Sequence, residues 1–226
     1  MYKRQVLEGE KDLPKVPKVM DKYGTMLAQE FIPNGGSVGV SYLFNSGETR
    51  AVFSHRRLLE YPESGGPSIV RESIRHEEAE EAGLRLLQRM KWHGVAMVEF
   101  RIDSRNGKPV LIEVNPRFWG SLPLAIASGV DFPRLLCDMY EHGDVPVVST
   151  YDMGVKCVNL LPLGMASIMA SNGARRACDI ARNAVRSGCF DVESLEDPMP
   201  TLGALISMFE YVGDKSKRET FFGREH

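Results

Sequence analysis

The chain has 226 residues, a net charge of −2 and 43% apolar residues. This length is enough to bury a sizeable core in one large or two small domains. The near-neutral charge, without a basic stripe, argues against nucleic acid as a partner. The sequence contains no apolar run of about 18 residues, which argues against a membrane span.

The four cysteines, Cys137, Cys157, Cys178 and Cys189, show neither C-x-x-C spacing nor paired histidines nearby. This pattern predicts neither a zinc site nor a disulfide framework. We therefore expect reduced, mostly buried thiols, as in a cytoplasmic protein. No signal peptide is visible, although truncation at the N-terminus would hide one.

The first five residues, Met1–Gln5, match the translation of a transposon end used in sequencing libraries, with GTG read as the start codon. We expect them to be an artefact of library construction, and the alternative is a chance pentapeptide at a natural start. Such residues do not enter the fold prediction. The polar segment that follows contains two prolines and predicts a short helix over Val16–Tyr23.

Alternating apolar residues predict strands at Met26–Phe31, Ser37–Phe44 and Thr49–Phe53. A glycine-rich loop at Ser64–Ser68 separates them from a long helix over Ile74–Met90. The acidic first half of that helix is predicted to be a solvated face near the positive end of the helix dipole.

The second half of the chain predicts a strand pair followed by a mostly helical region. A composition shift at Gly143–Pro146 separates two helices from a later strand and two further helices. In chain order these elements are Leu122–Ser128, Phe132–Glu141, Val155–Leu161, Gly173–Ser187 and Pro200–Phe209.

The segment Val110–Arg117, with the sequence VLIEVNPR, aims three polar groups the same way from an apolar strand. Successive side chains in a strand point to opposite faces, so Glu113, Asn115 and Arg117 share one face. Carboxylate and amide oxygens suit Mg²⁺, which usually keeps phosphate oxygens among its ligands. A guanidinium next in line suits a phosphate or carboxylate.

A preceding strand, His93–Ile102, carries Glu99, and the turn between the two strands contains Asn106-Gly107. A two-residue loop would place Glu99 opposite Val114, on the other face. A three-residue loop with Gly107 in the left-handed conformation places Glu99 opposite Glu113. We favour the second register, because two adjacent carboxylates are hard to keep ionised without a cation between them. The alternative is an ordinary solvated hairpin face.

Glu99, together with the EVNPR segment and the FWGS sequence that follows it, resembles the end of the nucleotide site in the ATP-grasp superfamily. That superfamily includes carbamoyl-phosphate synthetase and many carboxylate–amine ligases. The resemblance spans about residues 25–140, and the FSHRRL, EYP and GGPS motifs are similar to those of a subgroup of predicted carboxylate–amine ligases.

The resemblance implies an α+β fold, the C-terminal lobe of an ATP-grasp enzyme, with a central antiparallel sheet flanked by helices. Residues 6–33 would be a remnant of the small lobe and linker strand, residues 34–146 the large lobe with the Mg-ATP site, and residues 147–226 a mostly helical extension. The family's initial α/β domain and phosphate-covering lobe are missing from this sequence, so we expect the chain alone to be inactive.

The resemblance also implies ligands for a metal and for ATP. Glu99, Glu113 and Asn115 would hold Mg²⁺, with Mn²⁺ as a substitute, on the phosphates of ATP. Arg117 would hold the transferring phosphoryl group or the acyl phosphate. The linker strand, with its residues Gln29, Glu30, Phe31 and Ile32, would bind adenine.

Other candidate residues are open to two interpretations. His55 and Arg57 would bind the acyl phosphate or the substrate carboxylate, or they form a surface charge cluster with Arg56. The loop residues Gly65, Gly66 and Ser68 would present backbone N–H groups to phosphate or substrate, or form a plain turn. Many family members have a second Glu that grips the ribose; here Ser37 takes that position, which puts the ribose contact in doubt.

The activity implied is that of an ATP-dependent carboxylate–amine ligase. The γ-phosphoryl group of ATP would pass to a substrate carboxylate, and an amine would attack the acyl phosphate to form a C–N bond. The expected partners are a small-molecule carboxylate and amine, without nucleic acid or membrane, and an oligomer is possible. The alternatives are a non-catalytic nucleotide-binding or scaffolding protein, or a bicarbonate carboxylase, which would need a biotin or carboxyphosphate partner that the sequence does not show.

Overall fold

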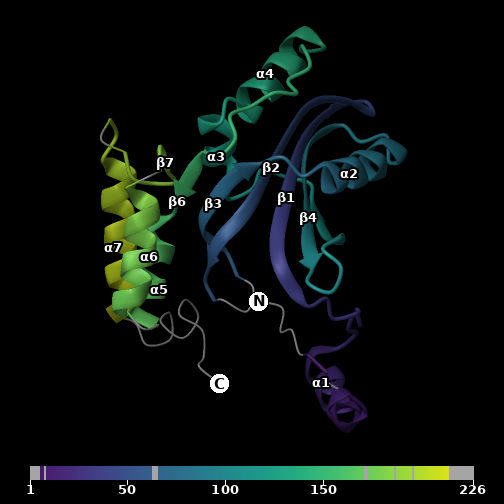
Figure 1. The fold of residues 1–226 in the computed structure, drawn as a ribbon, viewed down its shortest axis with the longest axis vertical. Coiled ribbons are helices and arrows are strands. Elements are labelled where there is room, and N and C mark those ends of the chain that lie inside the picture. The colour runs from purple at the N-terminus through teal and green to yellow at the C-terminus, as the bar shows by residue number, and fades with distance from the viewer. Residues whose placement is uncertain are drawn as a thin grey trace.

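The computed structural model describes residues 6–7, 9–62, 66–170, 173–185, 187–194 and 196–213. Met1–Gln5 and Gly65 lie outside these residues. In the described part of the chain, seven strands form one sheet in the order β5-β4-β1-β2-β3-β6-β7 (Figure 1). The strands are β1 Asn34–Asn45, β2 Glu48–Glu60, β3 Ser68–Ile74, β4 Gly94–Asp103, β5 Pro109–Asn115, β6 Lys156–Val158 and β7 Cys189–Phe190.

Neighbouring strands are antiparallel except for the parallel pair β6–β7. Helices pack beside this sheet, so the predicted α+β fold with a central antiparallel sheet is confirmed. A 3-10 helix, Glu10–Lys15, and a π-helical turn, Leu160–Gly164, accompany the α-helices. These are α1 Val16–Tyr23, α2 Glu77–Arg89, α3 Leu122–Ala127, α4 Phe132–His142, α5 Met165–Ala170, α6 Gly173–Ala184 and α7 Met199–Gly213.

One face of the sheet packs against α2. Alternate residues of β1 point to this face, among them Val40, Tyr42 and Phe44, which are all fully buried. Ala79 and Leu87 of α2 close the same core from the other side. The strand and helix periodicities in the sequence therefore arise from one shared apolar layer.

The opposite face of the sheet is divided into an apolar part and a polar part. In the apolar part, Leu43 and Phe53 pack against Trp119, Leu124 and Phe132 from the segment containing α3 and α4. Farther along the same strands, this face carries the charged and polar side chains of the candidate site. The two helices thus cover only one end of the face.

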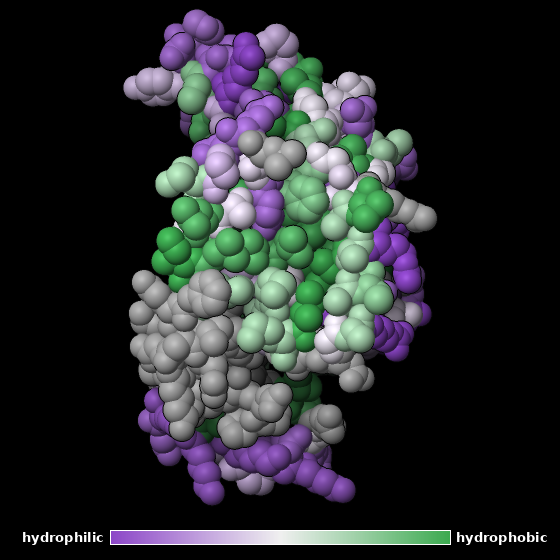
Figure 2. All heavy atoms as spheres, turned by 90° about the vertical axis from the view of Figure 1, so that its left-hand side faces the viewer, coloured by the Kyte–Doolittle hydropathy of each residue, from purple (hydrophilic) through white to green (hydrophobic). Residues whose placement is uncertain are grey.

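The C-terminal helices α5–α7 lie beside β6 and β7, at the far edge of the sheet from β5 (Figure 1). Figure 2 views this side and shows apolar side chains gathered there. Met199, Leu202 and Ile206 of α7 contribute exposed apolar surface. Among the described residues, no helix is long and apolar enough to cross a membrane.

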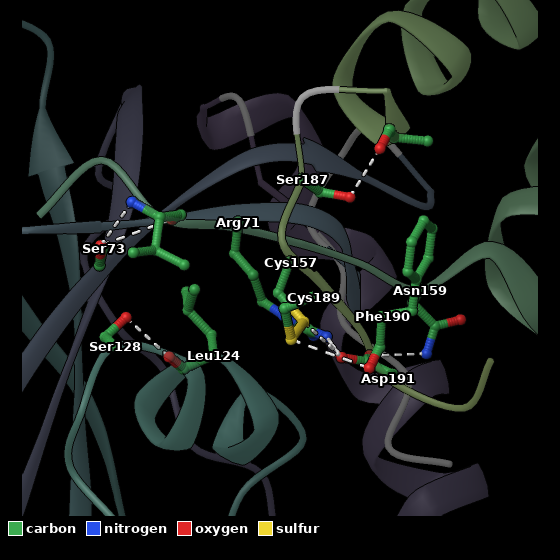
Figure 3. Close-up of a disulfide and its surroundings, with 12 residues drawn as sticks. Arg71, Ser73, Leu124, Ser128, Cys157, Asn159, Ser187, Cys189, Phe190 and Asp191 are labelled. Carbon is green, nitrogen blue, oxygen red and sulfur yellow. Dashed lines mark hydrogen bonds and ion pairs between the residues drawn. A yellow bond between two sulfur atoms is a disulfide. The ribbon is translucent and has the colours of Figure 1, made fainter. Parts of the chain in front are cut away.

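A buried ion pair joins this C-terminal region to the sheet. Arg71 of β3 pairs with Asp191, which follows β7, and only 4% and 8% of their side chains are exposed. Asn159 donates a hydrogen bond of 2.9 Å from Nδ2 to Asp191 Oδ2. Figure 3 shows both side chains directed at Asp191, next to a disulfide between Cys157 and Cys189.

The prediction of four reduced, mostly buried cysteines is wrong. Cys157 and Cys189 form a disulfide, because the parallel register of β6 and β7 places them side by side. Cys137 and Cys178 are free but exposed. Sequence spacing could not reveal the pair, since 32 residues separate the two cysteines.

Several predicted elements differ from the observed ones. Met26–Phe31 is not a strand: its residues are exposed, and no strand in the described part of the chain pairs with it. β2 extends well beyond Phe53, and Ile74 ends β3 instead of starting α2. The helices α1, α3, α4, α6 and α7 match their predictions to within a few residues, as expected for element ends.

We predict that Asp191→Ala lowers the free energy of unfolding by about 3–5 kcal/mol, because it leaves the Arg71 charge buried without its partner. Asp179→Ala is the matched control, since it removes an acid that pairs with Arg182 at the surface. That change should cost less than about 1 kcal/mol. Urea denaturation at pH 7 measures both, and equal small losses would contradict the account.

Candidate functional site

Two carboxylates face each other across the β4–β5 hairpin. Glu99 of β4 pairs directly with Glu113 of β5, as the favoured register predicts. Both lie on the polar part of the sheet face. In the next strands, the same row continues through Gly39 of β1, His55 of β2 and Ser73 of β3.

The Glu99–Glu113 pairing is as predicted, but the hairpin loop is longer than the predicted three residues. Asp103 N donates to Lys108 O at 2.9 Å, so four residues lie between the bonded positions. Gly107 has φ +73°, the left-handed conformation expected for it. A register shift between Glu99 and Phe100 then inserts one extra residue, Ile112, into β5. This β-bulge brings Glu113 opposite Glu99.

Asn115 connects the two carboxylates. Its Nδ2 donates to Glu113 Oε1 at 2.9 Å and to Glu99 Oε1 at 3.4 Å. Its Oδ1 accepts a hydrogen bond of 3.2 Å from Arg117 Nη2. The four residues that the sequence predicts on this ribbon therefore form one connected group, with the amide N–H group between two acids.

Arg57 approaches the acid pair from β2. Its Nη2 lies 2.5 Å from Glu99 Oε2, and its Nη1 contacts Glu60 Oε1 at 3.4 Å and Gly66 O at 3.3 Å. Burial raises the pKa of Glu99, the Arg57 charge opposes this rise, and the neighbouring Glu113 adds to it. The pair thus concentrates negative charge at a partly buried position.

The donor set suits a hard cation. Two carboxylates and an amide oxygen are the ligand types that Mg²⁺ takes, with phosphate or water oxygens completing its octahedron. Arg57 and Asn115 donate hydrogen bonds to Glu99 in this structure. These donors balance negative charge that a bound cation would otherwise balance. Within the described residues, no group of three or more His, Cys, Asp or Glu side chains could hold a metal ion. The amide of Asn115 is therefore essential to this assignment.

The His55 side chain lies on this sheet face but is buried from solvent. It is 2% exposed, and its Nε2 is 3.1 Å from Ser121 Oγ. A Cβ atom on Gly39 would lie 2.4 Å from His55 Cε1, so glycine is what leaves room for the ring. Arg56 points to the opposite face and pairs with Glu72. His55 and Arg57 share a face, whereas Arg56 does not join them in a cluster.

The buried position of His55 lowers its pKa to about 3, through desolvation first and then the charges of Arg71 and Arg57. The ring is consequently neutral at pH 7. A neutral, buried ring bonded to Ser121 positions neighbouring strands and helices. It does not present a charge to a substrate.

The predicted adenine strap is exposed. Gln29, Glu30 and Phe31 are open to solvent, and Ile32 is buried. Glu30 Oε1 accepts a hydrogen bond of 2.9 Å from Arg105 Nη2 in the β4–β5 loop. The strap thus runs beside the hairpin that carries the acid pair.

The glycine-rich loop has only some of its residues described. The Ser68 hydroxyl donates to Val70 O at 3.0 Å, and Ser68 is 8% exposed, so the hydroxyl serves local structure. Gly66 offers its carbonyl to Arg57. A Cβ atom on Gly66 would lie 2.1 Å from Tyr61 O, so the two chain segments approach too closely for a side chain here.

Sequence analysis missed three residues that shape this region: Glu60, Arg176 and Ser121. Glu60 contacts Arg57, Ser121 contacts His55, and Arg176 Nη2 donates to Glu60 O at 2.5 Å. Glu60 and Ser121 occur within the motifs quoted above. Arg176 carries no comparable signal, because it comes from a distant helix with several basic residues.

A sequence profile described as "ATP-grasp in the biosynthetic pathway with Ter operon" matches residues 23–160, more than half of the chain. No curated protein sequence matches this chain. The fold of this chain also occurs in solved structures. The biotin carboxylase–β,γ-ATP complex from Campylobacter jejuni is 19% identical, with a TM-score of 0.54 over 67% of this chain and 37% of that one.

The second structure is N5-carboxyaminoimidazole synthetase from Staphylococcus aureus. It is 18% identical, with a TM-score of 0.56 over 75% of this chain and 46% of that one. An ADP complex of the same enzyme gives a TM-score of 0.54 at 17% identity. The chain therefore spans less than half the length of these structures.

We predict that His55 makes the protein less stable as the pH falls from about 6.5 towards about 3. Its folded-state pKa of about 3 lies below its ordinary value of 6.5, so the unfolded chain binds a proton in this range and the folded protein does not. The slope should approach about 1.4 kcal/mol per pH unit. Above pH 6.5 the contribution is fully present.

The measurement is the free energy of unfolding against pH for the parent and for His55→Gln. The substitution changes the free energy of unfolding by a constant amount through altered packing. The pH dependence of the difference arises only from titration of the His55 ring. Subtracting the two curves should give a difference that changes between pH 6.5 and 3 and is flat above this range. A difference that stays flat throughout would show that the ring titrates normally.

Proposed function

Because the chain belongs to the family of ATP-grasp proteins in the biosynthetic pathway with Ter operon, we propose that it is the C-terminal part of an ATP-dependent ligase that joins a carboxylate to an amine. The single observation that carries this proposal is the pairing of Glu99 with Glu113, with Asn115 between them. Oxygen ligands gathered on a rigid β-ribbon are what Mg-nucleotide chemistry requires.

The proposed reaction has two steps. A substrate carboxylate oxygen attacks the γ-phosphorus of ATP, so a bond forms between them and the bond to the β-phosphate oxygen breaks, releasing ADP. The amine nitrogen then attacks the acyl carbon. Inorganic phosphate leaves, the nitrogen loses a proton, and an amide results.

The chain's own residues would divide this work between binding and charge stabilisation. Glu99, Glu113 and Asn115 would hold Mg²⁺, or Mn²⁺ in its place, which would neutralise charge on the phosphates of ATP. Arg117, whose Nη2 donates to Asn115 Oδ1 at 3.2 Å, would bind the transferring phosphoryl group. The strap Gln29–Ile32 runs beside the hairpin and would contribute the adenine contacts.

Arg57 has a role on the other side of the acid pair. Its guanidinium contacts Glu99 and would bind the acyl phosphate or the substrate carboxylate. His55 projects from the same face of β2 as Arg57, because the two residues are two positions apart in the strand. We assign to His55 a positioning role.

The acid pair also favours this proposal over a non-catalytic rival. A scaffolding protein without catalysis would have no need of the acidic ligands, and both are present with their amide partner. The two solved structures share the fold at low identity, and this likeness does not favour carboxylation. The proposed partners are a small-molecule carboxylate and amine. Since the enzyme would consume ATP, we propose a cytoplasmic location.

We predict that the chain binds Mn²⁺ and that Glu113→Ala and Asn115→Ala each weaken this binding at least about tenfold. Each change removes one of three protein ligands, which costs about 1.4 kcal/mol or more. Electron paramagnetic resonance of free Mn²⁺ during a titration measures the affinity directly, without any need for turnover.

The control is Glu78→Ala, which removes an exposed acid from α2 and should leave Mn²⁺ affinity unchanged. Circular dichroism checks that each variant is folded. Folded Glu113→Ala and Asn115→Ala proteins that bind Mn²⁺ as tightly as the parent would refute the metal assignment.

A further inference from the structure

A disulfide joins the last two strands of the sheet at its C-terminal edge. Cys157 of β6 and Cys189 of β7 are direct partners in the parallel register, and 32 positions in the chain separate them. Within the described part of the chain, β7 is the outermost strand on this side, and it is only two residues long. The disulfide therefore closes the segment that carries α5 and α6 and ties its end to the sheet.

Asp191, two residues after the disulfide, connects this edge to the interior of the protein. Its carboxylate pairs with the buried Arg71 of β3 and accepts a hydrogen bond from Asn159. Its backbone N–H donates to Val158 O of β6 at 3.1 Å. Figure 3 shows Arg71 and Asn159 directed at Asp191 beside the two sulfur atoms. The position of Asp191 thus depends on how firmly β7 is held to β6.

Arg71 in turn connects this ion pair to the candidate site. In the register of β2 and β3 it lies directly opposite Arg57, whose Nη2 contacts Glu99 Oε2 at 2.5 Å. Like charges at opposed positions of neighbouring strands repel each other. Asp191 offsets the charge of Arg71 in this arrangement. A change in how Asp191 is held would consequently alter the charge beside Arg57.

The same positions also accommodate the reduced form of the cysteine pair. Cys157 Sγ lies 3.3 Å from Asp191 Oδ1, and Cys189 Sγ lies 3.8 Å from Phe190 O. A thiol is a weak hydrogen-bond donor, so each S–H group would have an acceptor in place after reduction. Opening the disulfide would therefore leave neither buried donor unpaired, and the Cys157 thiol would share Asp191 with Arg71.

We infer that Cys157 and Cys189 form a redox switch, which holds β7 and Asp191 against the sheet when oxidised and loosens them when reduced. The reductant is a low-molecular-weight thiol. Disulfides of cytoplasmic proteins are usually transient or redox-sensing, so the inference rests on the proposed location for the source of this thiol. Cys189 is the more exposed partner, at 9% against 0% for Cys157, and local opening of a short edge strand would expose its sulfur further.

The exchange has two steps. The thiolate of the small molecule attacks Cys189 Sγ, the bond between the two protein sulfurs breaks, and Cys157 Sγ leaves with the electron pair and takes up a proton. A second thiolate then attacks the small molecule's sulfur in the mixed disulfide, and Cys189 Sγ leaves in the same way. Two electrons have passed to the protein, and the other product is the disulfide of the small molecule. The reverse reaction closes the switch again.

The first test equilibrates the folded full chain in glutathione buffers, from a large excess of the thiol form to a large excess of the disulfide form. N-ethylmaleimide then blocks free thiols, and peptide mass spectrometry identifies which cysteines carry it. We expect Cys157 and Cys189 to change together from disulfide to thiol across the series. A disulfide that survives the most reducing buffer, or thiols that persist in the most oxidising one, would overturn the inference.

The second test compares backbone hydrogen exchange in the oxidised and the reduced chain by NMR at one pH and temperature. The Asp191 amide should exchange at least about tenfold faster in the reduced chain, because a disulfide disfavours local opening by at least this factor. The amides of β1, in the middle of the sheet, should be unchanged. Equal rates for Asp191 in the two forms, or equal acceleration of Asp191 and β1, would count against the switch.

Cys189→Ser keeps the size of the side chain and cannot form the disulfide, so its Asp191 amide should exchange fast in both buffers. Cys178→Ser is the matched control, since it removes a free, exposed thiol from α6 and should keep the redox-dependent difference. Slow exchange in folded Cys189→Ser would overturn the inference. The measurements on the parent chain decide the question even if this variant does not fold.

None of these measurements uses a metal or a nucleotide. The proposed function fails separately, on the loss of Mn²⁺ binding described above, so the two failures are distinguishable.

Discussion

The candidate site depends on the register of the β4–β5 hairpin, which sets Glu99 opposite Glu113. A strand shift of one residue would turn Glu113 to the other face of the sheet. The bulge at Ile112 and the left-handed Gly107 together set this register. Backbone pairing thus holds the Cα atoms of the two acids opposite each other.

The rest of the fold supports this ribbon by dividing one sheet face in two. Trp119, Leu124 and Phe132 bury one end of the face under the segment containing α3 and α4. The other end keeps its polar row, and the buried His55 ring fills the space that Gly39 leaves there. The C-terminal helices add Arg176 to a pocket beside this row. Charged groups are thus held against a rigid apolar layer, which limits their motion.

Local patterns in the sequence predict most of the strands, most helices and the facing acids, whereas the central antiparallel sheet is what the family resemblance implies. Alternation in β1 reports burial on one face, and the two-residue period of a strand identifies Glu113 and Asn115 of β5 as neighbours in space. The length of the hairpin loop was predicted wrongly, because the compensating bulge at Ile112 leaves no mark on the pattern. The strap Met26–Phe31 has strand-like residues but no strand beside it among the described residues, so propensity alone misassigned it.

Long-range contacts could not be predicted in the same way. The disulfide, the Arg71–Asp191 pair and the position of Arg176 join segments far apart in the chain. Each depends on how β6, β7 and α6 dock against the edge of the sheet. Spacing within one sequence carries no information on that docking.

Paramagnetic broadening of backbone amide signals by Mn²⁺ locates a bound cation directly in the protein. The competing acidic surface is the first half of α2, which carries Glu77, Glu78 and Glu81 in exposed positions. If the hairpin acids organise the cation, the signals around Glu99 and Glu113 will broaden first, at the lowest Mn²⁺ concentrations. Broadening centred on α2, with the hairpin signals unchanged, would contradict the account.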